Sequence, residues 1–104
     1  VEGCVVRAEP GARLITIETQ ARAAGWELRC YPSTWVKATL GGFFGGGAGG
    51  VGGVRWGGIA TGDTVKSITV LTCEAEPRTI RYDGPPPFTA LRTFGTTGVM
   101  IEIE

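Results

Sequence analysis

The sequence predicts an α+β fold in which a mixed, largely antiparallel sheet is flanked by helices. One segment places apolar residues at helical spacing, and several short runs rich in β-branched residues are separated by glycine and proline turns. These segments do not alternate strand and helix regularly, as a parallel α/β sheet would require. The chain has 104 residues, 42% of them hydrophobic, which is enough for one small domain with its own core.

The first quarter of the chain predicts a strand, a turn and a helix. Cys4–Glu9 is short, apolar and β-branched, and EPG at Glu9–Gly11 ends it with a turn. Helical spacing of apolar residues runs through Ala12–Ala24, and Gly25 follows where a left-handed cap would end the helix. The charged residues of this helix are expected to form a solvated face: Arg13, Glu18 and Arg22.

The following elements are predicted to be extended or strand-like. Trp26–Ser33 is expected to be extended, since the residue before Pro32 is disfavoured in helical geometry. Thr64–Glu74 and Thr79–Tyr82 are rich in β-branched residues and are joined by the turn AEPR, which predicts a hairpin. The remaining segments are, in order, a stiff loop at Asp83–Pro87, a short helix at Phe88–Thr93, and a glycine turn feeding a final strand within Gly95–Glu104.

Composition and charge exclude several classes of function. Ten basic residues balance ten acidic ones, so nothing favours nucleic acid or an anionic membrane as a partner. No apolar run reaches the length of a membrane span or resembles a signal peptide. Strand patterns at both ends, without polar tails, indicate an excised segment of a longer protein.

The three cysteines are widely spaced and the chain has no histidine, which excludes the usual zinc patterns and predicts no metal site. An odd number of cysteines also argues against a disulfide scaffold, so a cytoplasmic location is expected. The simplest interpretation of Cys4, Cys30 and Cys73 is that each is a small buried hydrophobe.

The glycine-rich stretch GGFFGGGAGGVGGVRWGG, Gly41–Gly58, holds eleven of the chain's eighteen glycines. A flexible linker is one interpretation, but it would expose Phe43, Phe44 and Trp56. A second is that these glycines only turn corners, since the chain has no asparagine to adopt positive φ. The third is that the bare backbone lies against a flat ring or a pyrophosphate. Neither a P-loop nor a Rossmann fingerprint is present.

Three ordered motifs bear on this choice: YPSTWVKATLGGFFGGGAGG at Tyr31–Gly50, VRWG at Val54–Gly57, and GTTGVMIEIE at Gly95–Glu104. Together they resemble the FAD-binding domain of the FAD-linked oxidases of the p-cresol methylhydroxylase and vanillyl-alcohol oxidase type. That group includes D-lactate dehydrogenases and the glycolate oxidase flavoprotein subunit. VVRAEPGARL at Val5–Leu14 also looks like the strand, turn and helix start of that family, so the resemblance covers nearly the whole chain.

The resemblance implies FAD as the cofactor and assigns cofactor contacts residue by residue. Relatives often carry Thr-Asn-Ala or similar residues where this chain has Gly46–Gly49, so contacts there would have to come from the backbone. The implied contacts are Pro32, Ser33, Thr34, Thr39, Gly41, Gly42, Gly46, Gly47, Ala48, Gly49, Gly95, Thr96, Gly98 and Val99. Short hydroxyl side chains and bare backbone N–H groups suit phosphate oxygens and a ring edge.

The departures from the family define the expected extent of the domain. Relatives hold the pyrophosphate with an earlier P-x-G-G-G-T-like loop, and a substrate domain follows the last strand. Neither is within these residues, so residues 1–104 are interpreted as a partial FAD-binding domain, the second subdomain. The missing subdomains and a homo-oligomer are expected partners.

The chain offers little catalytic chemistry of its own. It has no histidine, and the other acid–base candidates are better interpreted as turn or surface residues: Asp63, Asp83, Tyr31 and Tyr82. Ser33 and Ser67 lack a base partner. We therefore expect an FAD-binding segment of a flavin-dependent oxidoreductase acting on a small substrate such as a 2-hydroxy acid or an alcohol. The alternative is a non-catalytic, degenerate flavin fold that serves as a scaffold or interaction module.

Overall fold

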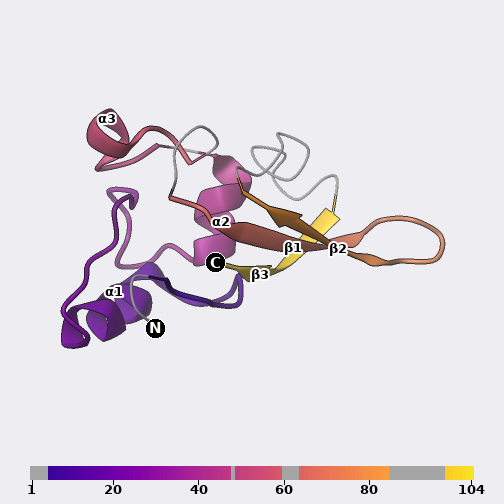
Figure 1. Ribbon diagram of the computed structural model, residues 1–104, viewed down its shortest axis with the longest axis horizontal. Coiled ribbons are helices and arrows are strands. Elements are labelled where there is room, and N and C mark those ends of the chain that lie inside the picture. Colours follow the sequence, from indigo (N-terminus) through magenta and orange to yellow (C-terminus); the bar gives the residue numbers. More distant parts are fainter. Residues whose placement is uncertain (1–4, 48, 60–63, 85–97) are drawn as a thin grey trace.

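A computed structural model describes residues 5–47, 49–59, 64–84 and 98–104. Within these residues the chain forms helices α1 (Leu14–Ala23), α2 (Leu40–Gly46) and α3 (Gly53–Trp56). The strands are β1 (Ser67–Thr72), β2 (Thr79–Asp83) and β3 (Gly98–Ile103), in the sheet order β2-β1-β3 with both pairings antiparallel. The helices gather at one end of the molecule and the β1–β2 hairpin projects from the other (Figure 1). The α+β prediction is confirmed.

The core lies between α1, α2 and the sheet. Two residues of α1 and three of α2 point into it, and they meet residues of β1 and β3 there. The side chains of this core cluster in these elements are Leu14, Ile17, Leu40, Phe43, Phe44, Ile68, Val70 and Ile103, and Ala21 of α1 is also buried. Apolar residues three and four apart in α1 explain why that helix buries one side.

Helix α1 follows its sequence signals, with one exception. It spans Leu14–Ala23, and Gly25 has a φ of 84°, the left-handed geometry expected after a helix. The expectation of a solvated charged face is wrong at Glu18, which is only 7% exposed. Its carboxylate accepts hydrogen bonds from Arg22 Nε at 2.7 Å and from the Leu28 backbone N–H at 2.8 Å. The chain after the helix therefore folds back over Glu18.

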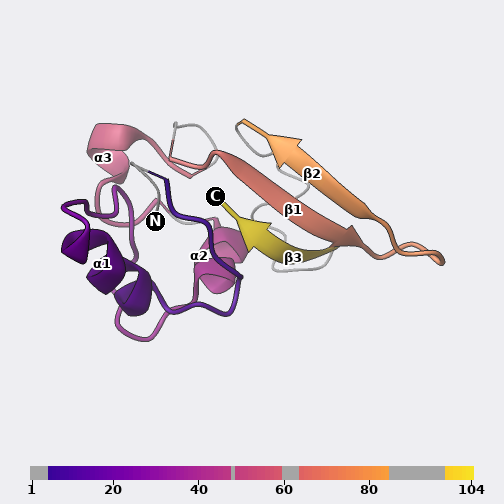
Figure 2. The same ribbon diagram turned by 60° about the horizontal axis from the view of Figure 1, so that its bottom comes forward.

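The predicted strand at Cys4–Glu9 is reduced to isolated β-bridge residues, Val5 and Ala8. Ala8 and Ile103 exchange two backbone hydrogen bonds of 3.0 Å, which places this segment antiparallel to the end of β3 (Figure 2). Pro10 follows two residues later and turns the chain away, so no longer ladder forms. Cys4 lies outside the described residues.

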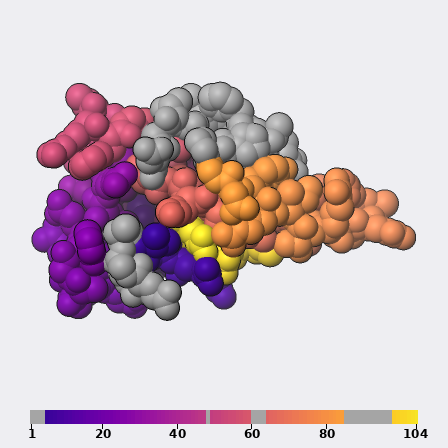
Figure 3. Space-filling model, in the orientation of Figure 1, coloured from indigo at the N-terminus to yellow at the C-terminus, as the bar shows by residue number. Residues whose placement is uncertain are grey.

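The hairpin is confirmed, with Ile68 opposite Tyr82 and Val70 opposite Ile80. Its loop corrects one expectation, because Cys73 is exposed rather than buried. Strand β1 ends at Thr72, which leaves Cys73 in the loop that projects from the molecule (Figure 3). Cys30 is buried as expected. The final strand is confirmed as β3, whereas the helix expected at Phe88–Thr93 lies outside the described residues.

The glycine-rich stretch is structured, so the linker interpretation is wrong. It contains α2 and α3, and Val51 between them forms a β-bridge with Tyr31. A Cβ at Gly50 would overlap the Tyr31 carbonyl, and one at Gly52 would overlap the Arg29 carbonyl. Both glycines also have positive φ, 61° and 92°. Glycine is therefore required on each side of Val51 for the two segments to pair.

Candidate functional site

The first turn of α2, where the cofactor contacts are predicted, satisfies its own backbone donors. Thr39 caps the helix, and its hydroxyl accepts a hydrogen bond from the Gly42 N–H at 3.1 Å. The Leu40 and Gly41 N–H groups donate to the carbonyls of Ala12 and Pro10, both at 2.8 Å. Unpaired N–H groups at a helix start can bind an anion. Here these N–H groups are already hydrogen-bonded within the protein, so they are not available to a phosphate.

Gly41 and Gly42 differ in the surroundings that a Cβ atom would meet at each position. Gly41 is half-buried, and a Cβ there would overlap Pro10 Cβ, so its role in the structure is close packing against the turn before α1. Gly42 is exposed, and a Cβ there would meet only the Thr39 hydroxyl, at 2.9 Å. The backbone of Gly42 is thus the part of α2 that a flat group could approach from solvent.

The turn before α2 carries two free hydroxyls. Ser33 and Thr34 are exposed, and within the described chain neither side chain has a hydrogen-bond partner. The turn itself is held by backbone bonds, from Trp35 N–H to the Pro32 carbonyl and from Ala38 N–H to the Thr34 carbonyl. Both hydroxyls therefore lie in the turn that leads into α2 and are available to a ligand.

The later glycines of the stretch have structural tasks. Gly47 has a φ of 66° and ends α2 by donating to the Phe43 and Phe44 carbonyls, both at 3.1 Å. Gly46 is the last residue of α2, and Gly49 lies near Gly53. Ala48 lies outside the described residues.

The last predicted segment lies beside α2. Helix α2 contacts β3, and a Cβ at Gly45 would lie 3.7 Å from Met100 Cε. In β3, Gly98 is buried against Val70 and Leu71, whereas Val99 is 55% exposed. Gly95 and Thr96 lie outside the described residues. The fold therefore brings two of the predicted cofactor segments together, although they are about fifty residues apart in the sequence.

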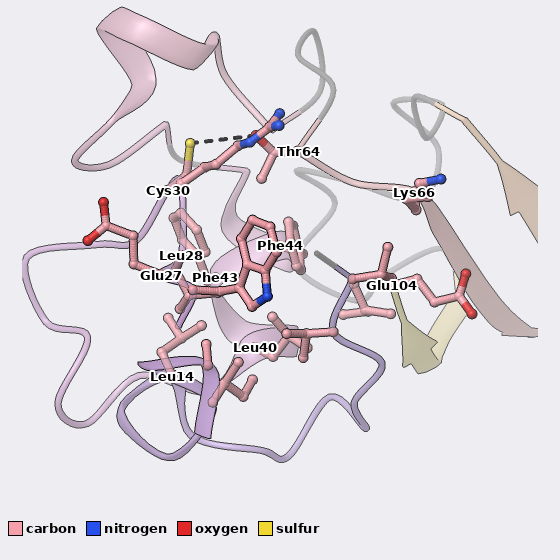
Figure 4. Close-up of a pocket in the computed structure, with 17 residues that line it drawn as sticks. Leu14, Glu27, Leu28, Cys30, Leu40, Phe43, Phe44, Thr64, Lys66 and Glu104 are labelled. Carbon is pink, nitrogen blue, oxygen red and sulfur yellow. Dashed lines mark hydrogen bonds between the residues drawn. The ribbon is translucent and has the colours of Figure 1, made fainter. Parts of the chain in front are cut away.

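A cavity of about 250 Å³ lies on the inner side of α2. Leu14, Leu40, Phe43 and Phe44 line its apolar part, while Glu27 and Lys66 lie on opposite sides of it (Figure 4). None of the predicted cofactor contacts lines this cavity. The sequence signal for this cavity was the adjacent pair Phe43 and Phe44 in the glycine stretch, because two adjacent aromatic residues are rarely left in solvent.

Glu104, at the rim of this cavity, is the most heavily bonded carboxylate of the described chain. It accepts hydrogen bonds from Arg7 Nε at 2.6 Å, from Ser67 Oγ at 3.0 Å and from Arg81 Nη2 at 3.0 Å. The hydrogen bonds from Arg7 and then Ser67 hold the pKa of Glu104 below its ordinary value of 4.5. This carboxylate joins the segment before α1 to the sheet.

Comparison with known proteins identifies the family. Residues 1–81 match the family model described as FAD binding domain, which covers more than half of the chain. The chain therefore belongs to the FAD binding domain family, and FAD is the cofactor of that family. No curated protein matches the chain significantly.

Two further observations concern other classes of site. In the described part of the chain, no helix is long and apolar enough to cross a membrane. Among the same residues, no three side chains of the metal-ligating types come together as a metal site would require.

Proposed function

We propose that this chain supplies part of the FAD site of a flavin-dependent oxidoreductase of the p-cresol methylhydroxylase and vanillyl-alcohol oxidase type. The family match over residues 1–81 carries the proposal. The ordered motifs of the sequence support the finer subtype, and relatives of that type suggest a small substrate such as a 2-hydroxy acid or an alcohol. A cytoplasmic location and association with further subdomains belong to the same proposal.

The residues fit a flavin in a specific way. Since the first-turn N–H groups of α2 are already bonded, Gly42 would contribute close backbone approach rather than hydrogen bonds. Hydrogen bonds would come from the free hydroxyls of Ser33 and Thr34. Bound FAD supplies the electron-transfer chemistry, while the protein positions it and excludes competing reactions.

The remaining proposed contacts are weaker candidates for direct bonding. Gly41 serves packing against Pro10, and the N–H of Gly47 closes α2. Thr39 uses its hydroxyl as a cap. The other described residues among the proposed cofactor contacts are Pro32, Gly46, Gly49, Gly98 and Val99.

The first experiment separates hydroxyl contacts from packing. We expect the double variant Ser33→Ala/Thr34→Ala to retain its thermal stability, because both hydroxyls are exposed and unpartnered, and to bind FAD about tenfold more weakly or worse. FAD affinity is measured by titration with flavin fluorescence as the readout. Unchanged affinity would remove these two residues from the proposed site.

A second variant tests whether the flavin approaches the Gly42 backbone closely. Gly42→Val is expected to lose bound FAD after gel filtration, while Gly53→Val keeps it, because Gly53 is also helical, lies in α3 rather than α2, and has room for a Cβ with no atom within 4 Å. The visible flavin spectrum of each purified protein gives the FAD content. Equal FAD content in the two variants would contradict close approach at Gly42.

A non-catalytic scaffold remains a second candidate, favoured by one observation. Within Gly46–Gly49, where backbone donors would have to replace the missing Thr-Asn side chains, the Gly47 N–H is used internally to end α2. Absence of FAD binding by a folded wild-type protein, tested together with its further subdomains, would support the scaffold and overturn the flavin proposal.

A further inference from the structure

Two arginines stack against one exposed tryptophan at the end of the molecule opposite the hairpin. The Arg29 and Arg55 guanidinium carbons lie 4.7 and 4.8 Å from the centre of the Trp56 ring. Trp56 is 39% exposed and ends α3, which forms a projecting corner of the surface (Figure 3). We call Arg29, Arg55 and Trp56 the arginine–tryptophan cluster. Stacking on the indole restrains both guanidinium groups.

The positive charge of this cluster is not balanced locally. Arg7, Arg22, Arg78 and Arg81 each form an ion pair, whereas Arg29 and Arg55 form none with the described residues. Because both guanidinium groups lie within 5 Å of one ring centre, they are less than about 10 Å apart, which is close to the screening length of about 8 Å at physiological salt. Two restrained like charges at this distance attract an anion jointly.

An open depression of about 660 Å³ borders the cluster. Arg29 and Trp56 line it together with two further aromatic residues, Trp26 and Tyr31. Trp26 is 49% exposed, so its indole is accessible to a ring from solvent. The volume lies within the range of small-molecule sites, roughly 300–1,000 Å³.

The glycines of the stretch hold this arrangement in place. The Tyr31–Val51 bridge is closed by backbone hydrogen bonds of 3.2 and 2.7 Å, and Gly52 lies directly against the Arg29 carbonyl. Helix α3 begins at the next residue, which sets Trp56 beside Arg29. The cluster is thus positioned by rigid backbone pairing rather than by two independent loops.

We propose that this depression binds a nucleotide diphosphate. Its phosphates would pair with Arg29, which lines the depression, and its planar base would stack on the exposed indole of Trp26. Arg55 stacks on the same Trp56 ring but does not line the depression, so it would add positive charge nearby. Arg22 and Glu27 also line the depression, but Arg22 is paired with Glu18 at 2.7 Å and with Glu27 at 3.9 Å. Arg29 is therefore the lining cation that has no ion pair with the described residues. None of Ser33, Thr34, Thr39 or Gly42 lines this depression, so the site is separate from the proposed flavin contacts.

The test is calorimetric titration of the protein with ADP, before and after saturation with FAD. We expect ADP to bind in both cases, Arg29→Gln to weaken binding about tenfold or more, and Arg55→Gln to weaken it less, because Arg55 does not line the depression. Arg13→Gln is the matched control, because Arg13 is exposed and lies outside the depression, and it should bind ADP like the wild type. Glu27→Gln should bind ADP more tightly.

Three outcomes would overturn the proposal. The first is ADP affinity in Arg29→Gln equal to that of the wild type. The second is equal affinity for inorganic pyrophosphate and ADP, since the ring would then contribute nothing. The third is loss of ADP binding on saturation with FAD or in Ser33→Ala/Thr34→Ala, which would assign ADP to the flavin contacts. FAD content measured on the same samples keeps the two proposals distinguishable.

Discussion

Glu18 is the residue at which local pattern and tertiary structure disagree most clearly. It occupies a position with charged neighbours along α1, yet it is buried and bridges the helix to the returning chain. A buried carboxylate that accepts a backbone N–H fixes the position of that backbone, here at Leu28. The chain continues from Leu28 directly into Arg29, so the placement of the arginine–tryptophan cluster depends on this carboxylate.

The consequence can be measured by replacing the carboxylate with its amide. Glu18→Gln keeps the size of the side chain but turns an NH₂ group toward one of two donors, Arg22 Nε–H or Leu28 N–H. We expect a loss of about 1–3 kcal/mol in the free energy of unfolding, measured by urea denaturation. Arg22→Gln removes only the exposed partner and should cost less. Equal losses in the two variants would show that the bond to Leu28 has no separate effect.

At the scale of the element, α2 forms against its intrinsic preference. Four of its seven residues are glycine, which costs about 4 kcal/mol relative to alanine in helix propensity. Burial of Leu40, Phe43 and Phe44 contributes roughly 1.5–3 kcal/mol each and outweighs this cost. Packing therefore makes this helix, which is why propensity and spacing alone did not predict it.

Two glycines of α2 provide a matched pair. Gly45→Ala should stabilise the protein by up to about 1 kcal/mol, because its Cβ would make an ordinary contact with Met100. Gly41→Ala should destabilise it by about 1–3 kcal/mol, because its Cβ would overlap Pro10. Thermal unfolding of the two variants tests the expected stabilisation and the expected destabilisation in one experiment. Stabilisation by Gly41→Ala would contradict the packing role assigned to that glycine.

The sequence predicted the elements whose local signals are strong. The helix ending before Gly25, the hairpin and the last strand were all predictable, because periodicity and turn residues act within a few positions. The motif around Thr39–Gly42 predicted where to look for cofactor contacts. It could not reveal that the N–H groups there are already bonded to Pro10 and Ala12, because those partners are set by tertiary contact about thirty residues away.

At the scale of the whole molecule, Glu104 joins parts that are distant in the chain. Arg7 lies before α1, Arg81 lies in β2, and Ser67 lies in β1. Because the pKa of Glu104 is below its ordinary value of 4.5 in the folded protein, its stabilising effect is complete above that value. The effect is lost as the pH falls through the lowered pKa.

Acid unfolding tests this dependence. Below about pH 4.5 the wild type should lose stability more steeply than Glu104→Gln, as measured by urea denaturation at a series of pH values. Glu74 also has a lowered pKa, from its hydrogen bond with Arg78, but the pair is exposed on the hairpin. Glu74→Gln should therefore leave the pH profile nearly unchanged. A Glu104→Gln profile that follows the wild type would contradict the role of this carboxylate.

The Arg7–Glu104 contact also bears on the order in which the protein folds. It joins residues 97 positions apart, so forming it first would require closing nearly the whole chain as one loop. Hairpin and helix contacts close far shorter loops, which favours their earlier formation. Protonation of Glu104 would then accelerate unfolding more than it slows refolding, because an interaction absent from the transition state acts on the unfolding rate. The Glu104 carboxylate, which joins the two ends of the described fold, would thus stabilise the protein mainly by slowing its unfolding.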